Sequence, residues 1–205
     1  MRQYDMENEQ SEQQLMPQHY EWHQAFYTLI QHPRVETFQK LLQDPQAKAQ
    51  RAYLWMLLPG MLNGITTMLI VAQFMGSSWL TAIVLGSIVG SISGVMRYIT
   101  TGYLIQRLAV FFGGDKTAYG KFHYIRGIYL PAILLLYLLI TLLLGNNNIT
   151  FSIVFSALLA VEMILTGFAL RAVNKTMSWN RIMLTIYIWY FIVLITFTFI
   201  RIPYV

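Results

Sequence analysis

The chain has 205 residues, of which 56% are hydrophobic and 11% are charged, and it contains no cysteine. Because a soluble domain is roughly a quarter charged, this composition excludes an ordinary soluble fold and indicates an integral membrane protein. The lack of cysteine excludes disulfides, thiolate metal sites and a cysteine nucleophile. The net charge of +5 would indicate nucleic-acid binding only as a patch on a soluble face. Here the basic residues lie between apolar runs, so no nucleic-acid partner is expected.

The N-terminal part of the chain is predicted to lie outside the membrane core. Residues 1–18 are rich in Gln and Glu and poor in apolar residues, which predicts a polar disordered tail and no cleavable signal peptide. Over residues 19–51, helical spacing predicts short amphipathic helices in the cytoplasmic membrane interface. The apolar faces comprise Trp22, Phe26, Leu29 and Ile30, then Phe38, Leu41 and Leu42.

Three residues in this region suggest where the helices begin. Pro33 and Pro45 are expected at first helical positions, where the missing N–H costs nothing. Asp44 is expected to be the N-cap of the helix that continues into the membrane.

Five apolar stretches are long enough to cross ~30 Å of hydrocarbon, which takes roughly 20 helical residues. We predict transmembrane helices over residues 52–73, 79–112, 124–144, 149–170 and 182–200, because backbone amides in lipid must be paired within the segment. The second stretch would be about 51 Å long as a helix, so we expect one long helix whose last turns leave the membrane. The predicted fold class is all-α, a polytopic five-helix domain over 52–205.

The basic residues predict the orientation of these helices. Of the 14 lysines and arginines, five precede the first stretch, five lie on or beyond the second, and three join the fourth and fifth. The connectors FMGSS and GNNNIT contain none. By the positive-inside rule, the N-terminus is cytoplasmic and the C-terminus lies outside. The expected location is a prokaryotic inner membrane.

The segment GGDKTAYGKF, residues 113–122, has the composition of a phosphate-binding loop. A P-loop requires G-x-x-x-x-G-K-[ST] between a strand and a helix, whereas here Lys121 is followed by Phe122 and the flanks are membrane helices. We interpret Gly113 and Gly114 as the stop of the long second helix. The cations Lys116, Lys121 and Arg126 are predicted to contact anionic lipid head groups.

The order of three segments resembles the Yip domain, the module of Ypt/Rab-interacting membrane proteins. They are HPRVETFQKLL, then GGDKTAY (with Gly113, Gly114 and Lys116) followed by Pro131 at the opening of the third span, and LRAVNKTMSWNRIM. The resemblance covers about residues 25–202. It implies five spans, a cytoplasmic N-terminus and no catalysis. Eukaryotic relatives are linked to Rab GTPases through a larger N-terminal region, so Rab binding is not carried over to this chain.

The second stretch contains a stripe of small residues. Gly86, Gly90 and Gly94 follow i, i+4, i+8 spacing, which lets two helix backbones approach closely in lipid. The stripe has two interpretations, a subunit interface or tight packing within this bundle, and we favour the second.

Two ionisable residues lie well inside predicted spans, Arg97 and Glu162. A charge there usually faces a partner or water. The two residues are expected at comparable depth, so they can pair. The alternatives are that Arg97 extends to the interface and that Glu162 is protonated against Ser or Thr.

Other candidate sites are weak. His19 and His23 have the i, i+4 spacing of two metal ligands but no apparent third. Asp115 and His123 lie close in sequence, without the nucleophile and oxyanion donors that a catalytic site needs. No cofactor is expected. The sequence therefore predicts a non-enzymatic scaffold or accessory subunit that contacts the bilayer and other membrane-protein subunits or itself. The alternative is a component of a solute or ion transporter or channel.

Overall fold

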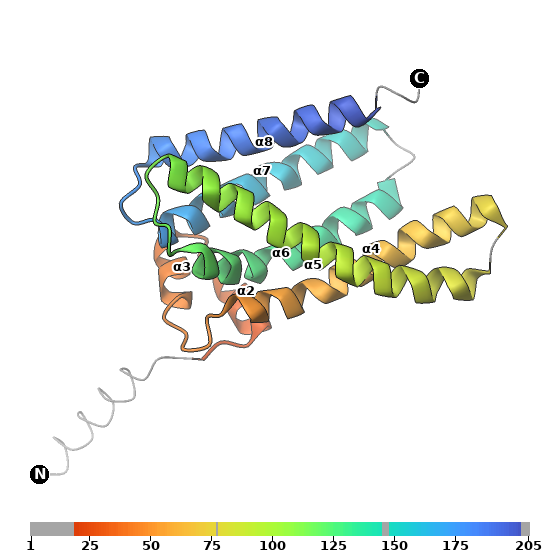
Figure 1. Ribbon diagram of the computed structural model, residues 1–205, viewed down its shortest axis with the longest axis horizontal. Helices are drawn as coiled ribbons and strands as arrows, with labels where there is room; N and C mark the ends of the chain where they lie inside the picture. The colour runs from red at the N-terminus through yellow and green to blue at the C-terminus, as the bar shows by residue number, and fades with distance from the viewer. Residues whose placement is uncertain (1–18, 77, 145–147, 202–205) are drawn as a thin grey trace, which may run out of the picture.

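The computed structural model describes residues 19–76, 78–144 and 148–201, and this part of the chain is helical, without a strand (Figure 1). The tail predicted over residues 1–18 lies outside the described residues. The helices are α2 (Trp22–Gln31), α3 (Val35–Leu41), α4 (Ala49–Met75), α5 (Trp79–Phe111), α6 (Tyr119–Leu144), α7 (Asn148–Val173) and α8 (Trp179–Arg201).

Four of these helices, α4 to α7, are long and apolar enough to cross a membrane, judged over the described residues. This confirms an all-helical membrane protein. The expectation that α5 is one continuous helix is also confirmed, since it runs unbroken over 33 residues. α6 begins at Tyr119, five residues before the predicted start at Tyr124. α8 is a helix in the predicted place, and its role as a fifth span stays a prediction.

One end of the bundle carries most of the exposed cations. α4, α6 and α8 begin there, whereas α5 and α7 end there (Figure 1). We call it the basic end. Its exposed basic residues include Lys48, Lys116, Lys121, Lys175 and Arg181.

α4 and α5 are held together by backbone contact along two rows of glycine. A Cβ atom at Gly90 would lie 2.5 Å from the Gly60 carbonyl oxygen and 2.6 Å from Gly64 Cα. Gly86 faces Gly64, and Gly94 faces Gly60, in the same way. The stripe in the second span therefore packs within the chain, as we favoured. The matching pair Gly60 and Gly64 in α4 was not predicted.

The end of α5 is a Schellman motif. Gly113 has φ +95°, the region that favours glycine. The Gly113 N–H donates to Val110 O at 3.0 Å, and the Gly114 N–H donates to Ala109 O at 2.8 Å, which satisfies two carbonyls that the helix end would otherwise leave unpaired. The expected helix stop at this glycine pair is confirmed.

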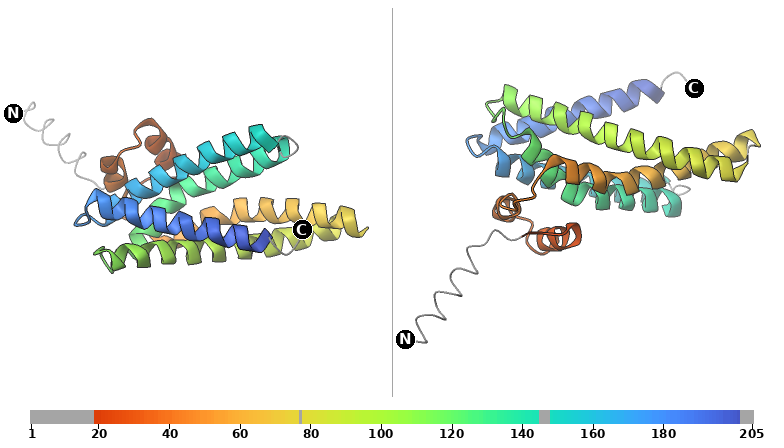
Figure 2. Two further views of the ribbon diagram at one scale, coloured as in Figure 1. Left: turned by 90° about the horizontal axis from the view of Figure 1, so that it is seen from above. Right: turned by 60° about the horizontal axis from the view of Figure 1, so that its bottom comes forward.

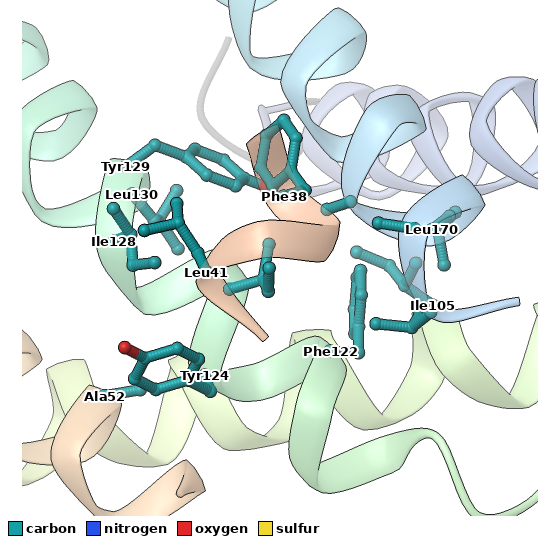
Figure 3. Packing of buried hydrophobic residues seen from close by; sticks show 14 of the residues in the cluster. Phe38, Leu41, Ala52, Ile105, Phe122, Tyr124, Ile128, Tyr129, Leu130 and Leu170 are labelled. Carbon is teal, nitrogen blue, oxygen red and sulfur yellow. The ribbon is translucent and has the colours of Figure 1, made fainter. Parts of the chain in front are cut away.

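α2 and α3 lie together at one side of the basic end (Figure 2). α3 enters the core, because Phe38 and Leu41 are fully buried. Figure 3 shows these two side chains between Tyr129 of α6 and Leu170 of α7. The Phe38 ring meets the Tyr129 ring edge-on, with centroids 6.4 Å apart. α3 is thus part of the protein core, and a place for α2 and α3 in the membrane interface stays a prediction.

The predicted starts of these helices were wrong. α3 begins at Val35 after the N-cap Arg34, so Pro33 lies two residues before the helix. α4 begins at Ala49 after the N-cap Lys48, and Pro45 lies in the preceding turn. Asp44 therefore caps no helix, because its carboxylate is used in the contacts described next.

Candidate functional site

The carboxylate of Asp44 joins the N-terminal helices to the bundle. Its side chain is completely buried. It accepts hydrogen bonds from the backbone N–H of Tyr20 at 3.0 Å and of Gln46 at 2.7 Å. The Tyr124 hydroxyl of α6 donates to it at 3.2 Å, and the Arg51 guanidinium of α4 lies 3.4 Å away. One side chain thus fixes the entry to α2, the turn before α4, and α6.

Ionisation of Asp44 is favoured by these contacts. Burial raises the pKa of the carboxyl group, but the hydrogen bonds from Gln46, Tyr20, His19 and Tyr124 outweigh that effect. The pKa of Asp44 therefore lies below its ordinary value. A buried carboxylate with this many donors is satisfied as an anion.

A second polar contact joins the loop after α5 to the loop after α7. The Oδ1 atom of Asn174 accepts a hydrogen bond from the Asp115 N–H at 2.7 Å. The Gln106 amide of α5 donates to the Asp115 carbonyl oxygen at 2.9 Å. Asn174 is fully buried. The backbone of the GGDKT loop is therefore held at Asp115 by hydrogen bonds to buried side chains.

Two of the three segments that carry the sequence resemblance are in contact through Asp115 and Asn174, and the third packs against α7 through Phe38 and Phe168. Phe38 comes from HPRVETFQKLL, Asp115 from GGDKTAY, and Asn174 from LRAVNKTMSWNRIM. We call the assembly of α2, α3, the loop 112–118 and the loop 174–178 the cap. The cap is held to the transmembrane helices by the contacts of Asp44 and Asn174, and by the Trp22 indole N–H, which donates to Ile128 O at 3.0 Å.

Arg126 lies beneath the cap, and its predicted contact with lipid head groups is wrong. The residue is only 4% exposed. Its guanidinium donates to Thr101 Oγ1 at 2.8 Å and to Tyr98 O at 3.3 Å, both on α5. The prediction failed because Arg126 lies on the face of α6 that packs against α5, which the sequence alone does not specify. Lys116 and Lys121 are exposed, and their contact with lipid stays a prediction.

His123 is enclosed by aromatic rings one turn before Arg126. The Tyr98, Tyr119 and Tyr53 ring centroids lie 5.2, 4.2 and 5.8 Å from the imidazole. A Cβ atom at Gly102 would lie 2.7 Å from Nε2, so only glycine leaves room for the ring. Neither ring nitrogen has a hydrogen-bond partner among the described residues. His123 and Asp115 are not brought together, since the carboxylate of Asp115 accepts from the Thr117 N–H at 2.7 Å instead.

Glu162 of α7 makes one of two polar contacts between α6 and α7. The Tyr137 hydroxyl of α6 donates to its carboxylate at 3.5 Å. One turn further along α7, the Thr166 hydroxyl lies 3.0 Å from the Tyr129 hydroxyl. The Glu162–Tyr137 and Thr166–Tyr129 contacts thus both join α7 to α6, one helical turn apart.

The predicted pairing of Arg97 with Glu162 is wrong as a direct ion pair. Arg97 is exposed on α5, and the ion pairs found within 4.0 Å among the described residues all join His19 or Arg51 to an acid. Glu162 is instead within reach of the Tyr137 hydroxyl. Sequence reasoning compared depth in the membrane, which does not specify the face of a helix.

His19 and His23 do not come together as metal ligands with a third group. No cluster of three or more His, Cys, Asp or Glu side chains occurs within residues 19–76, 78–144 and 148–201. His19 Nδ1 lies 3.3 Å from Asp44, and Nε2 lies 3.4 Å from Glu21. His23 is exposed. His19 thus supports the Asp44 contacts.

Comparison of the chain with family models, with curated proteins and with solved structures finds no match.

Proposed function

We propose that this protein is a non-enzymatic, Yip-like integral membrane protein that acts as a scaffold or accessory subunit of a membrane assembly. In this proposal α4 to α8 are five transmembrane spans in a prokaryotic inner membrane. The cap lies in the cytoplasm and the C-terminus lies outside. The orientation follows from the positive-inside rule, since the cap and the basic end carry the exposed cations.

The observation that supports this function is the construction of the cap. Two buried polar groups hold it: the Asp44 carboxylate joins Tyr20 to Tyr124 of α6, and the Asn174 amide joins the loop after α7 to Asp115. Such contacts hold a surface in one shape, which lowers the entropic cost of ordering it when a partner binds. The exposed charges of Lys40 and Lys116 lie on this surface. An acidic partner surface or anionic lipid head groups would complement them.

The experiment extracts the tagged protein from its native membrane in polymer nanodiscs and identifies its companions by mass spectrometry. We expect companion subunits, or further copies of this chain, in stoichiometric amount. Reversal of charge on the cap, Lys40→Glu with Lys116→Glu, should reduce their recovery about tenfold, because repulsion replaces attraction at each site.

The matched control keeps the charges, with Lys40→Arg and Lys116→Arg, and should retain the companions. Wild-type protein recovered as a monomer without companions would refute the proposal.

The contact of Glu162 with the Tyr137 hydroxyl, one turn from the contact of Thr166 with Tyr129, favours the second candidate function, a component of a proton or ion transporter. Intramembrane acids next to hydroxyl groups are typical of proton relays. Proton-dependent flux into proteoliposomes that disappears in Glu162→Gln would establish that function in place of the scaffold.

A further inference from the structure

An apolar groove lies between α7 and α8 near the basic end. It has a volume of about 290 Å³. Its walls run from Ala160 to Phe168 on α7 and from Trp179 to Tyr187 on α8, and they are almost entirely apolar. With α7 and α8 both spanning the membrane, as proposed above, an apolar groove between them faces acyl chains rather than water.

Gly167 forms the floor of this groove. A Cβ atom there would lie 3.1 Å from Ile186 Cδ1 and 4.0 Å from Trp179 Cζ3. A larger side chain at this position would therefore occupy the groove itself. The Trp179 ring packs edge-on against Phe168, with centroids 5.9 Å apart. Trp179 is half-exposed at the basic end of the groove, the position that tryptophan takes at the level of lipid head groups.

Basic residues border the loop between α7 and α8, at this end of the groove. Arg171 lies one helical turn beyond Gly167 on the same face of α7, and its guanidinium donates to the carbonyl oxygens of Lys175 and Met177. Lys175 is exposed in the loop that follows α7, and the Arg181 guanidinium donates to the Phe112 carbonyl oxygen at the end of α5. The sequence has no acidic residue after Glu162, so α8 and the preceding loop supply no carboxylate, and the nearest acid that the contacts show is Asp115, in the loop bound by Asn174.

We infer that the α7–α8 groove binds an acyl chain of one anionic phospholipid, with the phosphate beside Lys175 at the basic end. The narrow apolar channel suits an extended hydrocarbon chain. The cations at its mouth suit a negatively charged head group, as in other basic pockets between transmembrane helices on the cytoplasmic side. Trp179 marks the boundary between the two parts. The inference rests on the proposed function for placing α8 in the membrane as a fifth span and the basic end at the membrane surface.

The test measures lipid retained by the full chain in native mass spectrometry, after reconstitution with equal amounts of phosphatidylglycerol and phosphatidylethanolamine. We expect one phosphatidylglycerol to remain bound. Gly167→Leu should lower its retention about tenfold, the loss expected when about two methylene groups are excluded from the groove. Lys175→Glu should reduce the preference for phosphatidylglycerol over phosphatidylethanolamine about fivefold or more, because one favourable charge becomes repulsive.

Matched controls separate binding from folding. Gly120→Leu makes the same change where a Cβ atom meets nothing within 4 Å, and it should retain the lipid. Ala160→Phe fills the groove from its exposed end, so it should release the lipid even if Gly167→Leu fails to fold. Lys48→Glu makes the same change of net charge at the N-cap of α4, which packs on α5 and α6, and should leave the preference unchanged.

Three results would overturn the inference. The first is lipid retention unchanged in both Gly167→Leu and Ala160→Phe. The second is that the wild type forms a dimer, which the two variants dissociate while the lipid stays bound. The groove would then be a contact between two copies of the chain. The third is displacement of the signal by soluble glycerol phosphate, which would assign the site to a free phosphate. A protein that lacks companions but retains phosphatidylglycerol would refute the proposed function and leave this inference standing.

Discussion

Leucine at Gly90 is expected to prevent α4 and α5 from packing and to destabilise the fold by roughly 3 kcal/mol or more. The first carbon of any side chain there would lie 2.5 Å from the Gly60 carbonyl oxygen and 2.6 Å from Gly64 Cα. Both atoms belong to backbone, so the clash is relieved only if the helices separate. In lipid, close backbone contact is a main source of helix association, and separation removes it along the whole stripe.

The measurement is size-exclusion chromatography of purified protein, together with resistance to limited proteolysis. The Gly90→Leu variant should be aggregated and readily cleaved, and Gly90→Ala should be intermediate. Gly120→Leu is the control and should behave as the wild type. A folded Gly90→Leu protein that only loses an oligomer peak would contradict internal packing and restore the stripe as a subunit interface.

Asparagine at Asp44 is expected to lower stability by about 2–3 kcal/mol. Removal of one partner of a buried ion pair costs about 3–5 kcal/mol, and we take a smaller value because Arg51 keeps 19% of its side chain exposed. The amide group would also place N–H donors among the N–H and O–H donors that now surround the carboxylate. The melting temperature, followed by tryptophan fluorescence in detergent, should fall by about 4–12 °C. Asp115→Asn, in an exposed loop, is the control.

The effect of Asp44 on stability depends on pH in a defined direction. The pKa of Asp44 in the folded protein lies below its ordinary value, so the unfolded chain binds the proton more tightly. The stabilisation is complete above the unfolded pKa of about 3.9 and is lost as the pH falls through the folded pKa. The difference in stability between wild type and Asp44→Asn should therefore be constant at neutral pH and become smaller below about pH 4. A stability difference that does not change with pH would show that the charge of the Asp44 carboxylate does not stabilise the fold.

Properties set by local sequence were predicted well. The length of apolar runs predicted the helices from Ala49 onward, and the glycine pair at 113 and 114 predicted the end of α5. Both depend on neighbouring residues alone: an apolar run long enough to cross the bilayer, and a residue that adopts positive φ at low cost.

Properties set by contacts between distant segments were missed. Nothing beside Asp44 in the sequence indicates that Tyr124, 80 residues away, donates to its carboxylate. The glycines of α4 oppose the stripe in α5 only because the two helices pack face to face. The burial of Arg126 depends on the face that α6 turns to α5. Hydropathy locates a helix in the membrane but leaves its rotation about the axis undetermined.

The central claim is that the cap is a single assembly on the cytoplasmic side. The natural chain has no cysteine, so single cysteines report on position without a background. Suitable exposed sites are Lys40 on α3, Lys116 and Lys175 in the two loops of the cap, and Ser78 between α4 and α5.

Labelling these four single-cysteine variants with a membrane-impermeant maleimide in intact cells tests the claim most directly. The account predicts that Ser78→Cys is labelled in intact cells, whereas Lys40→Cys, Lys116→Cys and Lys175→Cys are labelled only after the membrane is permeabilised. Labelling of Lys116→Cys in intact cells would contradict the account. So would labelling that places one of the three cap positions on the other side of the membrane from the remaining two.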